Sequence, residues 1–75
     1  MDLNACILVK TTPTHTDEVL DAVRKLTGVK KAYIAYGRYD LIAFATATDY
    51  PGIRKLTSLV NALAGVRSTE TLVEA

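Results

Sequence analysis

Cys6 and His15 are the side chains of this sequence best suited to nucleophilic catalysis, and each residue type occurs once. A nucleophile needs a neighbouring base to activate it. Cys6 lies within the apolar stretch ACILV, where a cysteine usually packs as a small core residue. His15 lies in the polar stretch TTPTHTDE, and the sequence offers it no nucleophile to activate. The pattern therefore predicts no catalytic residue, and one cysteine with one histidine predicts no metal site.

A second set of polar residues has the chemistry to bind a small zwitterion. It consists of YGRYD at residues 36–40 and of the run Ser68, Thr69, Glu70 and Thr71. A carboxylate such as that of Asp40 can pair with an ammonium group, while turn amides and hydroxyls can bind a carboxylate. Each feature also has a simpler interpretation, a hairpin turn with Gly37 at positive φ and an ordinary threonine-rich edge strand. On the residues alone both interpretations stay open.

Two matching junctions indicate how the chain positions these residues. LTGVK at 26–30 and LAGVR at 63–67 each end a helical pattern of apolar residues with a glycine suited to a helix C-terminus. We expect Thr14 or Thr16 to cap the first helix and Asp49 to cap the second. Pro51 is tolerated in the first turn of the second helix. Four strands are predicted around the helices, at residues 3–10, 29–36, 41–47 and 66–73.

The predicted order is βαβ, a tight turn, then βαβ. Right-handed crossovers in both halves give an α+β, ferredoxin-like βαββαβ fold, with a four-stranded antiparallel sheet and both helices on one face. The first and third strands would be central. Cys6 and Leu8 alternate with Ile7 and Val9 on the first strand, so the face without helices is apolar too. Such a patch, on a 75-residue chain that cannot form an internal disulfide, predicts a homodimer.

Composition narrows the classes of function. The net charge is +1 with 23% charged residues, so direct binding of nucleic acid is not expected. The sequence has no apolar run of membrane-spanning length and no signal-peptide pattern, so we expect a cytoplasmic protein without membrane contact. The first loop lacks the paired cysteines of a copper chaperone, and Phe44 is the only aromatic residue on the two central strands, against RNA recognition. No cofactor-binding motif occurs, and no cofactor is predicted.

The order of elements, together with GVKKAYIAYGRYDLIA and LAGVRSTETLV, resembles the effector-binding RAM domain of the Lrp/AsnC family of transcription regulators. The resemblance covers essentially the whole chain. Its most specific feature is Gly-x-Tyr-Asp followed by Gly-Val-x-x-Thr-x-Thr. The resemblance implies a non-enzymatic module that binds an amino-acid effector in regulation, with dimers joined through their sheets and assembled into octamer or decamer rings.

Family effectors bind between dimers, and the resemblance carries this role to matching positions here. The ligand-binding residues so implied are Gly37, Tyr39, Asp40, Ser68, Thr69 and Thr71, with Arg38 at a variable position that tunes specificity. Full-length members carry an N-terminal helix-turn-helix, for which residues 1–75 leave no room, so we expect a single stand-alone RAM domain. Mixed assembly with a full-length Lrp/AsnC regulator stays open. Two alternatives are a dimeric α+β-barrel enzyme, which needs a catalytic His or Arg in a cavity, and a purely structural assembly domain.

Overall fold

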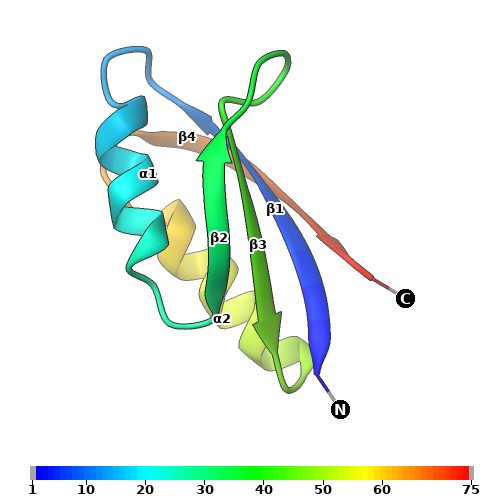
Figure 1. Ribbon diagram of the computed structural model, residues 1–75. Helices are drawn as coiled ribbons and strands as arrows, with labels where there is room; N and C mark the ends of the chain where they lie inside the picture. Colours follow the sequence, from blue (N-terminus) through cyan, green and yellow to red (C-terminus); the bar gives the residue numbers. More distant parts are fainter. Residues whose placement is uncertain (1, 75) are drawn as a thin grey trace.

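The computed structural model describes residues 2–74, which form two helices and four strands (Figure 1). In chain order the elements are β1 (Leu3–Thr11), α1 (Thr16–Arg24), β2 (Val29–Ile34), β3 (Leu41–Ala47), α2 (Tyr50–Asn61) and β4 (Val66–Val73). The predicted order βαββαβ is confirmed. The strand bounds agree with the sequence prediction except that β1 extends to Thr11 and β2 stops at Ile34.

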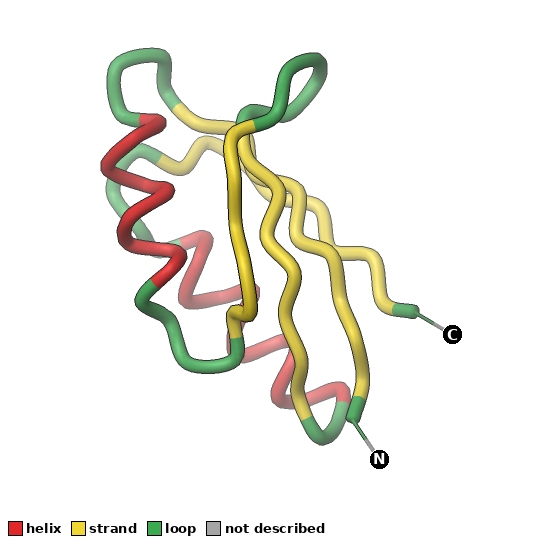
Figure 2. The backbone as a smooth tube through the Cα atoms, viewed as in Figure 1, coloured by secondary structure: helices red, strands yellow, loops and turns green. Residues whose placement is uncertain are grey.

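The strands form one antiparallel sheet in the order β2-β3-β1-β4. The prediction that the first and third strands are central is therefore confirmed. Both helices pack on the same face of the sheet, as the backbone trace shows (Figure 2). No helix of residues 2–74 covers the other face, which we call the open face. This arrangement is the ferredoxin-like fold.

The core lies between the helices and the side chains of β1 and β3 that point toward them. Ile7, Val9 and Leu41 are fully buried there. Burying a side chain of this size stabilises a fold by about 1.5–3 kcal/mol relative to leaving it exposed. The helical stripes predicted from sequence supply the other side of the core, and their buried residues are Val19, Leu20, Val23, Ile53, Leu56 and Val60.

Cys6 does not belong to this core, so the expectation of a small core residue is wrong. It is half-buried on the open face, paired across the sheet with Phe44 on β3 and Leu72 on β4. The reason is the two-residue alternation of a strand, which sends Cys6 to the face opposite Ile7. Burial still raises the pKa of the Cys6 thiol above its ordinary value.

The two helices begin differently. Asp49 caps α2 as predicted, with its Oδ1 accepting the Gly52 N–H at 2.8 Å, and a proline occupies the first turn. The cap predicted for α1 is wrong, because its N-cap residue is His15, which makes no side-chain capping hydrogen bond among residues 2–74. The Thr14 hydroxyl instead lies 3.2 Å from His15 Nδ1, and the Thr16 hydroxyl lies 2.7 Å from the hydroxyl of Thr11.

The repeated Gly-Val junctions have the same geometry in both halves. Gly28 and Gly65 have φ values of 98° and 93°, where a side chain is disfavoured. Each glycine carbonyl accepts a 2.9 Å bond from the end of a strand, Gly28 from Thr46 N–H and Gly65 from Thr12 N–H. A Cβ on Gly65 would also lie 2.8 Å from the Cβ of His15. The second junction therefore requires glycine for both backbone conformation and space.

Candidate functional site

The predicted ligand-binding residues of the first group lie in the connection between β2 and β3, residues 35–40, seen at the top of Figure 1. The Ala35 N–H donates to the Asp40 carbonyl at 2.8 Å, and the residues between them protrude as a loop. The connection is thus longer than the tight turn predicted from sequence. Gly37 has the expected positive φ, 130°, although no atom of the described part of the chain lies within 4 Å of the place its Cβ would take. Glycine is needed here for conformation and not for space.

Asp40 is tied to the end of β1. Its N–H donates to the Val9 carbonyl at 2.8 Å. Its carboxylate accepts two bonds from Thr11, from the backbone N–H at 2.8 Å and from the hydroxyl at 3.3 Å. Both bonds end on Oδ2, and Oδ1 takes part in neither. The contact occurs where the register between β1 and β4 shifts, between Lys10 and Thr11.

The hydroxyl-bearing residues predicted on the last strand, Ser68, Thr69 and Thr71, lie on both faces of the sheet, as expected. Ser68 is exposed and lies opposite Lys10, on the open face. Thr69 lies opposite the buried Val9, on the helix side, and donates its hydroxyl to Asn61 Oδ1 at 2.9 Å. A threonine has one hydroxyl proton, so Thr69 must leave Asn61 before it can donate to a ligand carboxylate.

Thr71 has a similar neighbour. It lies opposite Ile7, also on the helix side, and its hydroxyl is 2.9 Å from that of Thr57 on α2. The pair Thr69–Asn61 and the pair Thr71–Thr57 together join β4 to α2. Sequence alone gave no signal for this second use of the hydroxyls, because the partners belong to a separate element.

The two predicted groups do not meet within one chain. Leu41, which follows Asp40, pairs with Val9, and Val9 pairs with Thr69 on its other side. Two strand spacings separate the outer members of this row, which is about 10 Å. β1 therefore lies between the loop 35–40 and β4. To use its ammonium on Asp40 and its α-carboxylate on Thr71 of the same chain, a single amino acid would have to reach across β1.

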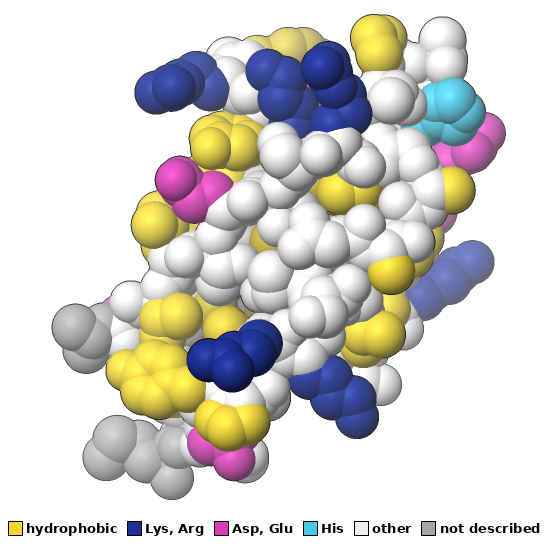
Figure 3. Space-filling model, turned by 180° about the vertical axis from the view of Figure 1, so that it is seen from behind, with side chains coloured by type: hydrophobic (Ala, Val, Ile, Leu, Met, Phe, Trp, Pro, Cys, Tyr) yellow, Lys and Arg dark blue, Asp and Glu magenta, His cyan; other side chains and the backbone are white. Residues whose placement is uncertain are grey.

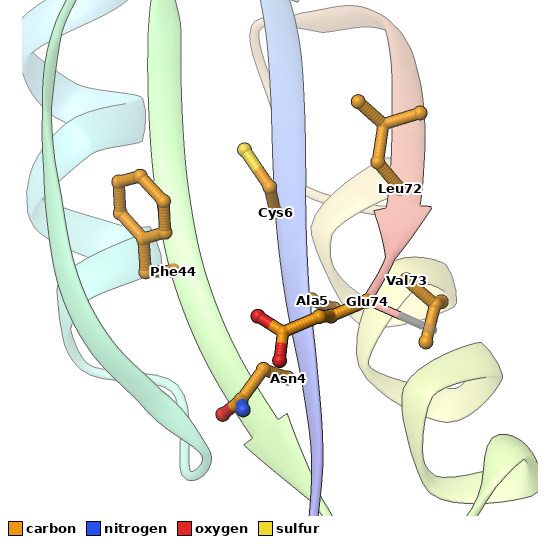
Figure 4. A pocket seen from close by; sticks show the side chains of 7 residues that line it. All are labelled: Asn4, Ala5, Cys6, Phe44, Leu72, Val73 and Glu74. Atoms are coloured by element: carbon orange, nitrogen blue, oxygen red, sulfur yellow. The ribbon is translucent and has the colours of Figure 1, made fainter.

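The open face holds a shallow hollow that sequence reasoning did not assign to a site. Its volume is about 240 Å³, and its lining residues are Asn4, Ala5, Cys6, Phe44, Leu72, Val73 and Glu74. Figure 4 shows Cys6 on β1 between Phe44 on β3 and Leu72 on β4. The Phe44 ring also lies 5.9 Å from the ring of Tyr33 and 5.3 Å from Lys31 Nζ. The surface is mainly apolar, with polar groups at its end.

Two further features bear on the kind of site. A second hollow of about 450 Å³ lies between the end of α1 and α2 and contains none of the predicted ligand-binding residues. The view from behind Figure 1 shows basic side chains in separate groups with uncharged surface between them (Figure 3). This face therefore lacks the continuous basic stripe that binds a phosphate backbone.

The geometry gives no support to a catalytic pair. His15 is exposed, with Nδ1 at 2.7 Å from the Thr12 hydroxyl, and it packs near Gly65 on the helix side. Cys6 is on the open face of the sheet. Within residues 2–74 no group of three or more His, Cys, Asp or Glu residues is placed to hold a metal ion.

Comparison with known proteins connects this geometry to a family. The family model of the Lrp/AsnC ligand binding domain matches residues 4–74. The HTH-type transcriptional regulator LysM of Sulfurisphaera tokodaii is 30% identical over 73 residues, which is 96% of this chain and 52% of that regulator. This chain thus spans about half the length of LysM. No helix within residues 2–74 is both long and apolar enough to cross a membrane.

Solved structures agree. The crystal structure of TTHA0845 from Thermus thermophilus superimposes with a TM-score of 0.93 at 26% identity, covering 97% of this chain and 92% of that one. The regulator NMB0573 of Neisseria meningitidis, solved in complex with L-Met, has the same fold, with a TM-score of 0.85 at 22% identity over 97% of this chain and 49% of that one. The chain belongs to the Lrp/AsnC family of transcriptional regulators, in which it corresponds to the ligand-binding domain.

Proposed function

We propose that this chain is an amino-acid effector-binding and assembly module that acts in amino-acid-responsive transcriptional regulation. The observation that carries the proposal is the position of Asp40 in a chain that matches the Lrp/AsnC ligand binding domain. Thr11 holds the carboxylate by Oδ2 beside the protruding loop, so Oδ1 is the atom offered to a ligand. Charge-assisted bonds between a carboxylate and an ammonium group are among the strongest hydrogen bonds in proteins. The ligand class is that of the L-Met bound by the structurally similar NMB0573.

The assembly we propose starts with a homodimer through the open face. Tyr33 and Leu72 are 42% and 54% exposed there, beside the half-buried Leu8 and Phe44. Contiguous apolar surface of this kind marks association sites on small proteins. Dimers then join into an octamer or decamer ring.

The effector site in such a ring is shared between copies. The loop 35–40 of one copy supplies Asp40, with Gly37, Arg38 and Tyr39 around it, and a neighbouring copy supplies the remaining contacts. The separation of about 10 Å between loop and β4 within one chain supports this division. Ser68 is the most suitable hydroxyl of β4 for a ligand, because it is exposed near the start of the strand and lies on the face away from α2. Thr69 and Thr71 contribute only if their contacts with α2 rearrange.

The proposed route to DNA is a partner. Mixed assembly with a full-length Lrp/AsnC regulator would bring a helix-turn-helix domain to the complex, as in the HTH-type regulator LysM. In this arrangement the chain itself makes no direct contact with nucleic acid. It alters the regulator through assembly and through the effector.

A second candidate function is a purely structural assembly domain. The observation that favours it is the use of the Thr69 and Thr71 hydroxyls in bonds to α2. If those bonds are permanent, β4 is a structural strand and the open face is the functional surface. Effector binding distinguishes the two candidates.

The test is a thermal-shift screen with each of the twenty L-amino acids, followed by calorimetric titration of those that raise Tm. For Asp40→Asn we expect affinity to fall roughly 10- to 100-fold, since a hydrogen bond to a charged group contributes about 1.5–3 kcal/mol. The fold should survive, because the Asn carbonyl can still accept the Thr11 N–H.

Asp21→Asn is the matched control, since it removes the same charge from the exposed surface of α1. Its affinity should equal that of the wild type, and circular dichroism should show all three proteins folded. Binding of no amino acid, or equal affinities for Asp40→Asn and the wild type, would count against the proposed site.

A further inference from the structure

Thr11 is the buried polar residue that links the effector loop to the start of α1. Its side chain is 3% exposed. Its hydroxyl oxygen lies 3.3 Å from Asp40 Oδ2 and 2.7 Å from the hydroxyl oxygen of Thr16. Two hydroxyl groups thus connect the end of β1 and the first residue of α1 with Asp40 of the loop 35–40, which is 29 residues away from Thr11 in sequence.

The direction of each hydrogen bond between Thr16, Thr11 and Asp40 follows from the number of hydroxyl protons available. An ionised carboxylate only accepts, so the Thr11 hydroxyl donates to Asp40. The single proton of Thr11 is then used, and the bond between the two threonines must run from the Thr16 O–H to Thr11 Oγ1. The order is Thr16 to Thr11 to Asp40. Each bond polarises the next, which strengthens the hold on the carboxylate.

Water is poorly placed to replace Asp40 as the hydrogen-bond acceptor of Thr11. Thr11 is enclosed, and its N–H, at the point where the β1–β4 register shifts, has Asp40 Oδ2 as its acceptor at 2.8 Å. A buried N–H that loses its acceptor destabilises the fold. The carboxylate is therefore fixed by two donors from the same residue, and Oδ2 is the atom they use.

We propose that Thr11 and Thr16 are positioning residues of the effector site. They hold the Asp40 carboxylate in one orientation, with Oδ1 presented beside the loop 35–40. The inference rests on the proposed function only for the identity of the ligand, an amino acid. The fixed orientation of the Asp40 carboxylate can be tested without it. Thr16 touches no ligand in this scheme. It acts only through Thr11.

Thr16→Val tests the proposal because it removes the hydroxyl and keeps the shape of the side chain. We expect amino-acid affinity to fall roughly 3- to 10-fold, the effect of one hydrogen bond. Thr16→Ser, which restores the hydroxyl, should recover wild-type affinity. Thr14→Val is the matched control, since the Thr14 hydroxyl contacts the exposed His15 ring and not the hydrogen-bonded series that leads from Thr16 to Asp40. Circular dichroism should show every variant folded.

A second measurement needs no ligand. In NMR spectra, the Hα–Hβ couplings of Asp40 should show one rotamer in the wild type and in Thr14→Val, and averaged rotamers in Thr16→Val. Amide exchange at Thr11 should be faster in Thr16→Val alone. The affinity measurements on the Thr16 and Thr14 variants use the twenty L-amino acids, each titrated separately.

The outcomes separate the two proposals. If no amino acid binds the wild type, the proposed function fails, and the couplings alone decide whether Thr16 positions Asp40. Unchanged couplings and exchange in Thr16→Val overturn the positioning role. An averaged Asp40 rotamer with wild-type affinity also overturns it, because the orientation would then not matter for binding.

Discussion

The two faces of the sheet are built from similar residues but differ in burial. Along β1, Ile7 and Val9 point to the helices and are fully buried, whereas Leu8 between them is half-buried on the open face. On β3 the same alternation separates the buried Leu41 from the half-buried Phe44. Both faces carry large apolar residues, but the helices cover only one of them, and the open face also carries Lys10 and Glu70. The covered face stabilises one chain, and the open face is the surface through which we propose that copies assemble.

The largest effect that tests this comparison is expected for Leu8→Asp. Leu8 lies between Ile42 and Glu70 across the sheet, so a new carboxylate there would face an apolar partner surface and add to an existing negative charge. Burying an unpaired charge weakens association by about 3–5 kcal/mol, or roughly 150- to 5,000-fold in the dimer Kd. Sedimentation equilibrium at micromolar concentration measures the change. A wild type that is monomeric, or a variant that assembles normally, would show that the open face is not the interface.

A smaller effect, on the stability of the single chain, is expected for a substitution of Ile7, the residue next to Leu8 on the covered face. Ile7→Val removes one methylene from the covered face and should lower the free energy of unfolding by about 0.5–1.5 kcal/mol. The dimer Kd should not change, because Ile7 points away from the open face. Urea unfolding and sedimentation of the same variant measure both quantities. If Ile7→Val weakens assembly as much as it weakens the fold, the two faces are not independent.

The smallest effect concerns Cys6, which reports on the open face as the single thiol of the chain. Burial raises the pKa of this thiol, so less thiolate is present at a given pH, and alkylation should keep accelerating as pH rises beyond the ordinary thiol range. Assembly should slow alkylation further by covering the face. We therefore expect Cys6 to react several-fold faster in Leu8→Asp than in the wild type. Protein unfolded in urea gives the reference rate, and equal rates in the two folded proteins would contradict the prediction.

Most of the fold was predictable because it depends on local patterns. Strand alternation and helical stripes place the elements, and Asp49 was identified as a cap because its bond to Gly52 spans only three residues. The cap of α1 could not be identified in this way. Thr16 has the right chemistry, but its hydroxyl contacts Thr11 on β1. Thr11, a residue outside the helix, competes with the helix N-terminus for the Thr16 hydroxyl, and this competition decides whether Thr16 caps the helix.

The candidate site was predictable only in part. The positive φ of Gly37 follows from its place in the turn, and the sequence predicts that the hydroxyls of β4 fall on both faces. Their partners do not follow from the sequence. The acceptor for Thr69 is on α2, and the donor to Asp40 is 29 residues away, on β1.

The sequence by itself determined the family, the order of elements, the central strands and the apolar character of both sheet faces, because periodicity and turn chemistry are properties of neighbouring residues. The tertiary structure alone decided which of Ile7 and Leu8 is covered, that β1 separates the loop 35–40 from β4, and that Asp40 is held by Thr11. The physical reason is that a hydrogen bond or a buried contact depends on distance in space. Strand pairing and helix placement bring distant residues together, and only the folded chain fixes which ones meet.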